Sequence, residues 1–281
     1  MKRYLKMTGY IALYLIVLYA ALRGVHWFVF NICSKNKALS DFLWSNKTLF
    51  SFSISVISVS IYYLIFKLRK KSLLKVCSFS KIRAKGILGI TAMGISMSLF
   101  TTCFTGISAV NRAFPQFETY MKGFFESKGS VFILLIMLVV LPMFEEIIFR
   151  GMIFNELKTN LPIVPAVIIQ AVIYGVLQFN PVLGTYAAVG SIIYVLPYIW
   201  SRSLWGSILV QDTCILSLFI MRRSGLKELL LSSGDTGLVL LMLIGIAGMV
   251  ISAYLVWKSC KKQHIPVQAA IKVESSAAIN R

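Results

Sequence analysis

The sequence predicts an all-α fold, a polytopic membrane helical bundle with about eight transmembrane helices. Of its 281 residues, 58% are hydrophobic and only 14% are charged, whereas a soluble domain carries about 25% charged residues. Apolar runs long enough to cross a bilayer recur along the chain, separated by shorter polar or basic stretches. Together these observations indicate a membrane protein with no separate soluble domain.

Eight apolar runs are predicted to cross the membrane. In chain order they are residues 10–32, 49–66, 86–110, 130–149, 161–179, 185–200, 204–221 and 238–257. The first follows a basic start, as in a signal peptide, but it exceeds the roughly 7–15 residues of a signal core and lacks a clear cleavage site. We therefore expect it to be retained as a span. The third is rich in glycine, serine and threonine, which suits close helix packing.

The connections between these runs are mostly polar. Residues 67–85 form the densest basic stretch, which indicates a stop-transfer anchor on anionic lipid or, alternatively, a docking site for a partner. Residues 111–129 are expected to form a loop at the membrane surface. Residues 155–160 are expected to form a short turn, and residues 222–236 a loop that contains glycine.

Residues 1–262 are expected to form one membrane-embedded domain, followed by a disordered cytoplasmic tail over residues 263–281. Eight spans place both termini on one side, and the distribution of basic residues predicts which side. With a cytoplasmic N-terminus, the inner segments hold 19 Lys and Arg residues and the outer loops hold nine. The sequence therefore predicts a multi-pass protein of the cell membrane, in contact with its lipids, with both termini cytoplasmic.

Charge and cysteine usage exclude several other classes. The net charge of +19 is interpreted as basic loops facing anionic lipid, and no nucleic-acid partner is expected. The five cysteines are scattered without a Cys-x-x-Cys pair, which predicts neither a zinc knuckle nor a disulfide framework. Because the two histidines, His26 and His264, lie near opposite ends of the chain, no metal and no cofactor is expected.

The most informative stretch ends the fourth apolar run and reads Glu145-Glu146-Ile147-Ile148-Phe149-Arg150-Gly151. A charge at the centre of a membrane helix costs about 2.5–3.5 kcal/mol on insertion scales, so ionisable residues there indicate function. On a helix, Glu146 and Arg150 share a face and are predicted to pair, which leaves Glu145 for a pocket. The alternative is an ion pair that only marks where the helix leaves the bilayer.

This string resembles the first motif of the CAAX-protease and bacteriocin-processing family, also called the Abi family, whose members are polytopic intramembrane proteases. The resemblance implies that Glu145 activates a water molecule. It also implies that Glu146 and Arg150 support the site, together with Tyr174 in the following span. The family-like core covers about residues 130–221.

The family's two further motifs depart from the pattern here. Each contains a histidine that helps to hold the water and the developing oxyanion, one four residues after an aromatic and the other four residues before an asparagine. In this chain Gln178 and Gln211 stand at the histidine positions, and Ile215 stands at the asparagine position. Glutamine both donates and accepts hydrogen bonds but does not titrate, so it does not shuttle a proton as histidine does.

The polar residues of the later spans are expected to meet in a pocket. Gln170, Tyr174 and Gln178 are spaced by four and predict one polar stripe on the fifth span. We expect Glu145, Gln178 and Gln211 to converge, because buried amides need partners. The alternative is a hydrogen-bonded helix bundle without chemistry, and Asp212 is either a further pocket acid or a partner of Arg202.

Three functions are compatible with these patterns. The first is a membrane protein with the CAAX-protease fold that is catalytically impaired and acts by binding a membrane or cell-envelope partner. The second is an active intramembrane endopeptidase that processes a peptide substrate with Glu145 as the general base for water. The third, a transporter or channel, lacks the repeat and broken-helix patterns of those classes.

Overall fold

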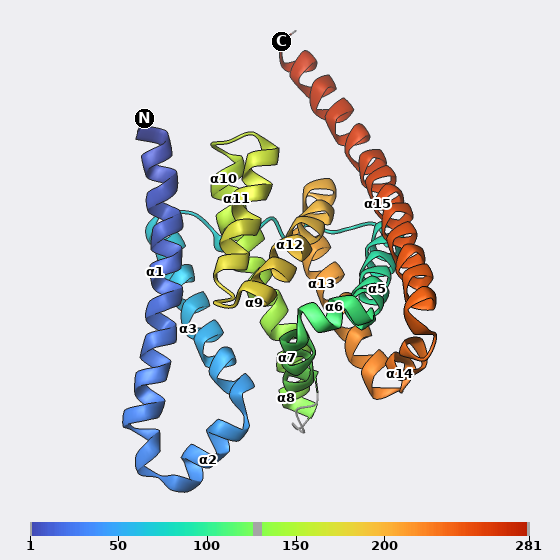
Figure 1. Cartoon of the computed structure of the whole chain (residues 1–281). Helices are drawn as coiled ribbons and strands as arrows, with labels where there is room; N and C mark the ends of the chain where they lie inside the picture. The colour runs from blue at the N-terminus through green and yellow to red at the C-terminus, as the bar shows by residue number, and fades with distance from the viewer. Residues whose placement is uncertain (1, 126–130, 280–281) are drawn as a thin grey trace. The chain divides into compact units, whose positions relative to one another are not determined.

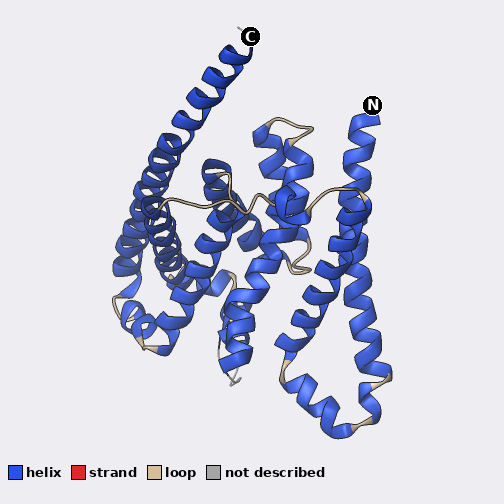
Figure 2. Ribbon diagram, turned by 180° about the vertical axis from the view of Figure 1, so that it is seen from behind, coloured by secondary structure: helices blue, strands red, loops and turns tan. Residues whose placement is uncertain are grey.

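A computed structural model describes residues 2–125 and 131–279 of the protein, and within them every regular element is a helix (Figure 2). Seven helices in this part of the chain are long and apolar enough to cross a membrane. They span Lys2–Asn31, Thr48–Leu68, Ala84–Gly106, Val131–Lys158, Pro181–Ser201, Leu204–Arg223 and Gly234–Lys261. The predicted all-α, multi-pass membrane architecture is therefore confirmed.

The predicted fifth span differs from the other seven. Helix α11 covers only Ile163–Val176, or 14 residues. At a rise of about 1.5 Å per residue it is about 21 Å long, against a hydrocarbon thickness of about 30 Å. The expected span over 161–179 is thus too long at both ends, and within the described residues seven helices rather than eight reach full spanning length.

The chain divides into two compact units. Unit 1 contains residues 1–79 and 119–192, and unit 2 contains residues 80–118 and 193–281. The expectation of one membrane-embedded domain over 1–262 stays a prediction.

Unit 1 begins with a pair of antiparallel helices. Helix α1 (Lys2–Asn31) leads through η1 (Cys33–Lys35) and α2 (Lys37–Ser45) to α3 (Lys47–Leu68). Figure 1 shows α1 and α3 side by side with α2 at the turn between them. The buried aromatic rings of Tyr14 and Phe66 stack with centroids 5.9 Å apart, and Tyr62 donates its hydroxyl hydrogen to the carbonyl of Tyr14 at 2.8 Å. These contacts hold the pair together where α1 and α3 cross.

The helical run that carries the charged motif is not a regular α-helix. It consists of α8 (Val131–Leu135), the π-helix η2 (Ile136–Val140), α9 (Leu141–Glu146), the π-helix η3 (Ile147–Phe154) and α10 (Asn155–Lys158). Pro142 follows η2 closely, and because it has no N–H to donate and its ring crowds the preceding turn, a regular i to i−4 ladder is interrupted there. Single-turn π segments occur frequently at functional sites.

Helices α11 and α12 (Pro181–Ser201) approach each other closely through two glycines. A Cβ atom at Gly175 would lie 2.6 Å from the carbonyl oxygen of Gly184, and one at Gly184 would lie 2.6 Å from the carbonyl oxygen of Gly175. Only glycine fits at both positions. The crossing therefore brings the backbones of the two helices together and sets the positions of the polar side chains farther along them.

Unit 2 is organised around α5 (Ala84–Gly106), which packs against α13 (Leu204–Arg223) and α15 (Gly234–Ile279). Figures 1 and 2 both show α5 beside α15. A Cβ atom at Gly94 would lie 2.7 Å from the carbonyl oxygen of Val210, so α5 and α13 are in backbone contact. Close helix packing through small residues, which the sequence predicts for this span, is therefore observed at Gly94.

Several expected loops are short helices. The stretch predicted as a surface loop over 111–129 contains the second half of α6 (Ser108–Ala113) and all of α7 (Pro115–Phe125). Residues 126–129 lie outside the described residues, as does Ser130 of the fourth predicted span. The loop over 222–236 contains α14 (Leu226–Leu231). The turn expected over 155–160 is mostly α10, because the preceding helix continues for one more turn.

The C-terminal end of α15 extends to Ile279. Side chains beyond Lys261 lie outside the described residues, as do residues 280–281. The disordered tail over 263–281 stays a prediction.

Candidate functional site

The charged motif forms the predicted ion pair in the interior of unit 1. Arg150 and Glu146 lie 2.6 Å apart, Nη1 to Oε1, and both side chains are 0% exposed. Glu146 ends α9 and Arg150 lies in η3, so the four-residue spacing puts both on the same side of the run. A buried charge is tolerated only when it is paired and hydrogen-bonded, so the two side chains make each other's burial possible.

Arg150 has a second, neutral partner on α12. Its Nη2 donates to the hydroxyl oxygen of Ser191 at 3.0 Å and to the carbonyl oxygen of Ser191 at 3.3 Å. Gln170 on α11 donates its Nε2 hydrogen to the same hydroxyl at 2.6 Å. All three side chains are fully buried. Ser191 therefore links the motif run to α11 and α12, and the Gly175–Gly184 crossing brings it within reach.

Glu145, the expected catalytic residue, lies beside this buried network and is partly exposed. Tyr174 on α11 donates its hydroxyl hydrogen to Oε2 of Glu145 at 2.7 Å. The Tyr174 ring packs edge-on against Phe149, with centroids 4.6 Å apart, and the Arg150 guanidinium carbon lies 5.1 Å from the centre of the Tyr174 ring. Tyr174 is thus held on two sides and fixes the direction of the Glu145 carboxylate.

Gln178 is not on the helix that the sequence predicts for it. Helix α11 ends at Val176, and the amide of Gln178 donates to the carbonyl of Gly175 at 3.1 Å in the turn that follows. Phe179 has a φ of 51°, in the left-handed region, and Asn180 accepts from the amides of two residues in the first turn of α12. Because the chain must reverse here before Pro181, the predicted stripe contains only Gln170 and Tyr174.

Gln211 and Asp212 lie in unit 2, in the middle of α13. The Gln211 side chain is buried, at 3% exposed, and Asp212 is partly buried. The expected convergence of Glu145, Gln178 and Gln211 joins residues of both units and stays a prediction. The two alternatives for Asp212 also stay predictions. The carbonyl of Arg202, one expected partner, accepts a hydrogen bond from the Ser80 hydroxyl at 3.0 Å.

Ligands for a metal ion are not gathered in this site. In the described part of the chain, no three His, Cys, Asp or Glu side chains cluster. Glu145 is bonded by the Tyr174 phenol and Glu146 by the Arg150 guanidinium. Neither a protonated phenol nor a guanidinium is a zinc ligand. The expectation of a site without metal or cofactor stays a prediction.

The arrangement separates two carboxylates with different surroundings. Glu146 is fully buried and neutralised by Arg150, whereas Glu145 is reachable and bonded by a neutral phenol. A carboxylate of the second kind can hydrogen-bond a water molecule, a backbone amide or a polar side chain of a bound segment. The chemistry available to this site is therefore that of one oriented, accessible acceptor beside a rigid polar network.

Ser191 is the site residue that the sequence analysis missed. The only signal for it is a small polar residue between Gly190 and Ile192 within the apolar run of the sixth predicted span. Its importance depends on the crossing of α11 and α12, which spacing along one helix does not reveal.

The fold and the site define a multi-pass helical membrane protein with a buried Glu–Arg pair next to an accessible glutamate. Residues 127–214 match the family model described as type II CAAX prenyl endopeptidase Rce1-like. The matched segment includes the motif, Gln178 and Gln211, and it confirms the resemblance to the CAAX-protease family. Comparison with curated proteins and with solved structures gave no match.

Proposed function

We propose that this protein uses a CAAX-protease type of helical bundle to bind a membrane or cell-envelope protein, and that it does so without efficient hydrolysis. The observation that carries the proposal is the occurrence of Gln178 and Gln211 where the family's motifs have histidine. The only two histidines in the chain, His26 and His264, lie outside the segment that matches the family model.

The loss of histidine removes proton transfer but leaves recognition in place. An amide donates and accepts hydrogen bonds at any pH near neutrality, yet it takes no proton from an attacking water or a leaving amine. Proton transfer by a positioned side chain contributes about 10²–10⁴-fold to a reaction rate. The buried pair of Glu146 and Arg150, which supports the site, is intact. In this proposal the residues of the site still bind a peptide segment, while their capacity for catalysis is weakened.

The experiment that tests this proposal is a complementation assay in the native host. The chromosomal copy is deleted and replaced by wild type, by Glu145→Gln or by Arg150→Ala. We expect Glu145→Gln to restore the wild-type phenotype, because the neutral amide keeps the shape of the site, and Arg150→Ala to fail, because it disrupts the fold. A Glu145→Gln strain that behaves like the deletion and accumulates an unprocessed peptide would refute the proposal.

The second candidate is an active intramembrane endopeptidase, and the exposure and orientation of Glu145 favour it. In this case Glu145 accepts a proton from water, and an amide of Gln178 or Gln211 donates to the oxyanion. One oxyanion donor contributes about 2.7–4 kcal/mol to a transition state. Such activity would survive chelating agents, because one carboxylate and two neutral amides are not a zinc ligand set, and it would disappear in Glu145→Gln.

We further propose that the protein lies in the cell membrane with both termini in the cytoplasm. The distribution of Lys and Arg supports this orientation, and it requires α11 to cross the membrane in spite of its length. If α11 does not cross, seven spans place the termini on opposite sides. A reporter fused after Lys262 that is active only outside the cell would contradict the proposed orientation.

A further inference from the structure

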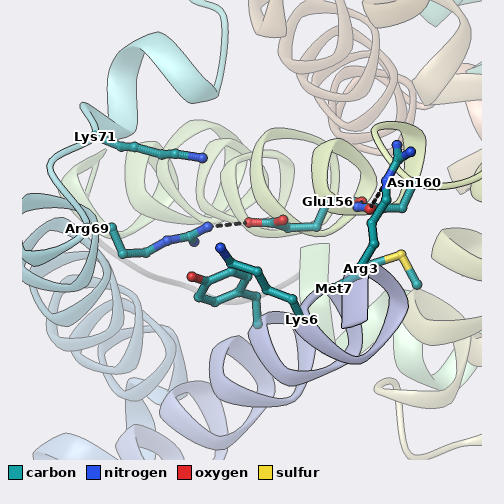
Figure 3. Close-up of a pocket in the computed structure, with 8 residues that line it drawn as sticks. Arg3, Lys6, Met7, Arg69, Lys71, Glu156 and Asn160 are labelled. Atoms are coloured by element: carbon teal, nitrogen blue, oxygen red, sulfur yellow. Dashed lines mark hydrogen bonds and ion pairs between the residues drawn. The ribbon is translucent and has the colours of Figure 1, made fainter. Parts of the chain in front are cut away.

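A basic cavity of about 290 Å³ lies in unit 1, apart from the site described above (Figure 3). It is formed where α1 begins, α3 has just ended and α10 ends. Its lining residues are Arg3, Lys6, Met7, Tyr10, Arg69, Lys71, Glu156 and Asn160. Four of these are cationic and one is acidic, so the lining carries three more positive than negative charges.

Arg69 forms a fixed side of this cavity. It pairs with Glu156 at 3.0 Å, and its guanidinium carbon lies 3.5 Å from the centre of the Tyr10 ring. The hydroxyl of Tyr14 donates to Oε1 of Glu156 at 2.9 Å and also contacts Arg69. Arg69 and Glu156 are therefore held in position and neutralise each other, which leaves the other three cations without a carboxylate among the lining residues.

Those three cations surround the Arg69–Glu156 pair. Arg3 donates hydrogen bonds to two neutral acceptors, the side-chain oxygen of Asn160 at 2.7 Å and the carbonyl oxygen of Thr159. Lys6 and Lys71 are exposed, and Figure 3 shows their side chains reaching toward the Arg69–Glu156 pair. Like charges that line one cavity repel one another, and an anion placed among them would relieve the repulsion.

The position of the cavity indicates where such an anion comes from. Helices α1 and α3 are both long and apolar enough to cross a membrane, and they pack as an antiparallel pair. The start of α1 and the end of α3 therefore lie at the same side of the bilayer, at the depth of the lipid headgroups. Basic pockets at the ends of membrane helices are suited to phosphate-bearing headgroups, and arginine and lysine are the side chains that bind phosphate.

We propose that this cavity binds a phosphate group, and its depth favours the phosphate of an anionic phospholipid as the source. Arg3 and Arg69, whose positions are fixed by their hydrogen bonds, orient the phosphate oxygens. Lys6 and Lys71 supply positive charge from two different parts of the chain. This role is more specific than a general attraction of the basic stretch 67–85 to the membrane, because it depends on which lysines line the cavity.

A pair of double variants tests the proposal. Lys6→Gln/Lys71→Gln removes two charges from the cavity, and Lys67→Gln/Lys70→Gln removes two exposed charges from the adjacent stretch that do not line it. Native mass spectrometry counts the phosphatidylglycerol retained on the purified protein. Melting temperatures compare nanodiscs of phosphatidylcholine with and without phosphatidylglycerol. Circular dichroism in phosphatidylcholine nanodiscs checks that each variant is folded.

We expect the cavity variant to retain the anionic lipid about thirtyfold less tightly than wild type, which corresponds to about 2 kcal/mol, and the control variant to be near wild type. Equal losses of lipid binding in both double variants would overturn the cavity as the binding site, because they would show only a general attraction of basic residues to the membrane surface.

In a third arm of the experiment, inorganic phosphate is added to phosphatidylcholine nanodiscs. If it stabilises wild type as much as phosphatidylglycerol does, the site takes phosphate from solution, which overturns the lipid source. Stabilisation by a poly-glutamate peptide but not by either phosphate source would overturn phosphate as the ligand.

Discussion

Tyr174 donates its hydroxyl hydrogen to the Glu145 carboxylate at 2.7 Å, and this bond joins the accessible acid of the site to its buried network. The ring of Tyr174 lies against Phe149 and near the Arg150 guanidinium. The direction of Glu145 therefore depends on the same residues that make the ion pair possible. A change in the network is expected to alter the presentation of Glu145.

Removal of the Tyr174 hydroxyl tests that link. In Tyr174→Phe the ring and its packing remain, but Glu145 loses a donor, and hydrogen bonds to charged groups are worth about 1.5–3 kcal/mol. We expect the free energy of unfolding in detergent to fall by about that amount. In a double-mutant cycle with Glu145→Gln the two losses should not add, because both variants weaken the same bond. Fully additive losses would show that the two residues are independent.

Arg150→Ala should be far more damaging. It leaves the fully buried Glu146 without its cation, and the loss of one partner of a buried pair typically costs about 3–5 kcal/mol. The yield of folded protein and its melting temperature in detergent measure the effect. Lys158→Ala, which removes an exposed cation from the end of the same helical run, is the matched control. Equal melting temperatures for the two variants would contradict a structural role for the pair.

Ser191→Ala tests the residue that links Arg150 to α11. The substitution removes the hydroxyl oxygen that accepts from both Arg150 and Gln170, and a buried donor left unsatisfied costs about 1–3 kcal/mol. We expect a loss of stability in this range. Ser53→Ala, which removes an exposed hydroxyl that donates to the carbonyl of Leu49 within its own helix, should change the melting temperature little. A Ser191→Ala protein as stable as the control would refute the link.

A pH-dependent contribution is expected from an ion-pair cluster in unit 2. Glu118 on α7 bonds to Arg222 at 3.0 Å and to Lys227 at 2.5 Å. Partial burial by itself raises the pKa of the Glu118 carboxyl, but the bonds to Arg222 and Lys227 hold its pKa below the ordinary value, which is about 4.3 for a free glutamate. Stability from this cluster is therefore present above that value and is lost as the pH falls through the lowered pKa.

The comparison of wild type with Glu118→Gln measures this contribution. Wild type should be the more stable protein at neutral pH, and the difference in melting temperature should shrink as the pH is lowered past about 4.3. Asp41→Asn, in the α2 segment of unit 1, is the control for a general effect of losing one acid. A difference that stays constant over this range would mean that the cluster does not stabilise the fold through the Glu118 charge.

Much of the fold was predictable from the sequence, because membrane-length apolar runs are a strong signal. Helix α13 begins at Leu204, where its span was expected to begin, and the four-residue spacing of Glu146 and Arg150 predicted their pair. The short helices α7 and α14, with the second half of α6, lie in segments predicted as loops, because brief amphipathic segments between spans have no strong hydropathy pattern. The predicted span over 161–179 is longer than α11, because apolar residues continue into the turn that ends at Phe179.

The candidate site was predictable only where its residues are neighbours along one helix. The importance of Ser191 comes from a crossing of two helices at Gly175 and Gly184, which depends on tertiary packing. The placement of Gln178 in a turn depends on how Asn180 and Pro181 begin the next helix. Periodicity along a single run contains neither fact.

The most direct test of the central claim is a cleavage assay on the protein in nanodiscs with a fluorogenic, prenylated peptide that ends in a CAAX sequence. Three proteins are compared, namely wild type, Glu145→Gln and the double variant Gln178→His/Gln211→His, with Ile215→Asn added if needed. We predict that wild type is no faster than Glu145→Gln, and that restored histidines raise the rate. Wild-type cleavage that survives chelating agents and disappears in Glu145→Gln would contradict the account.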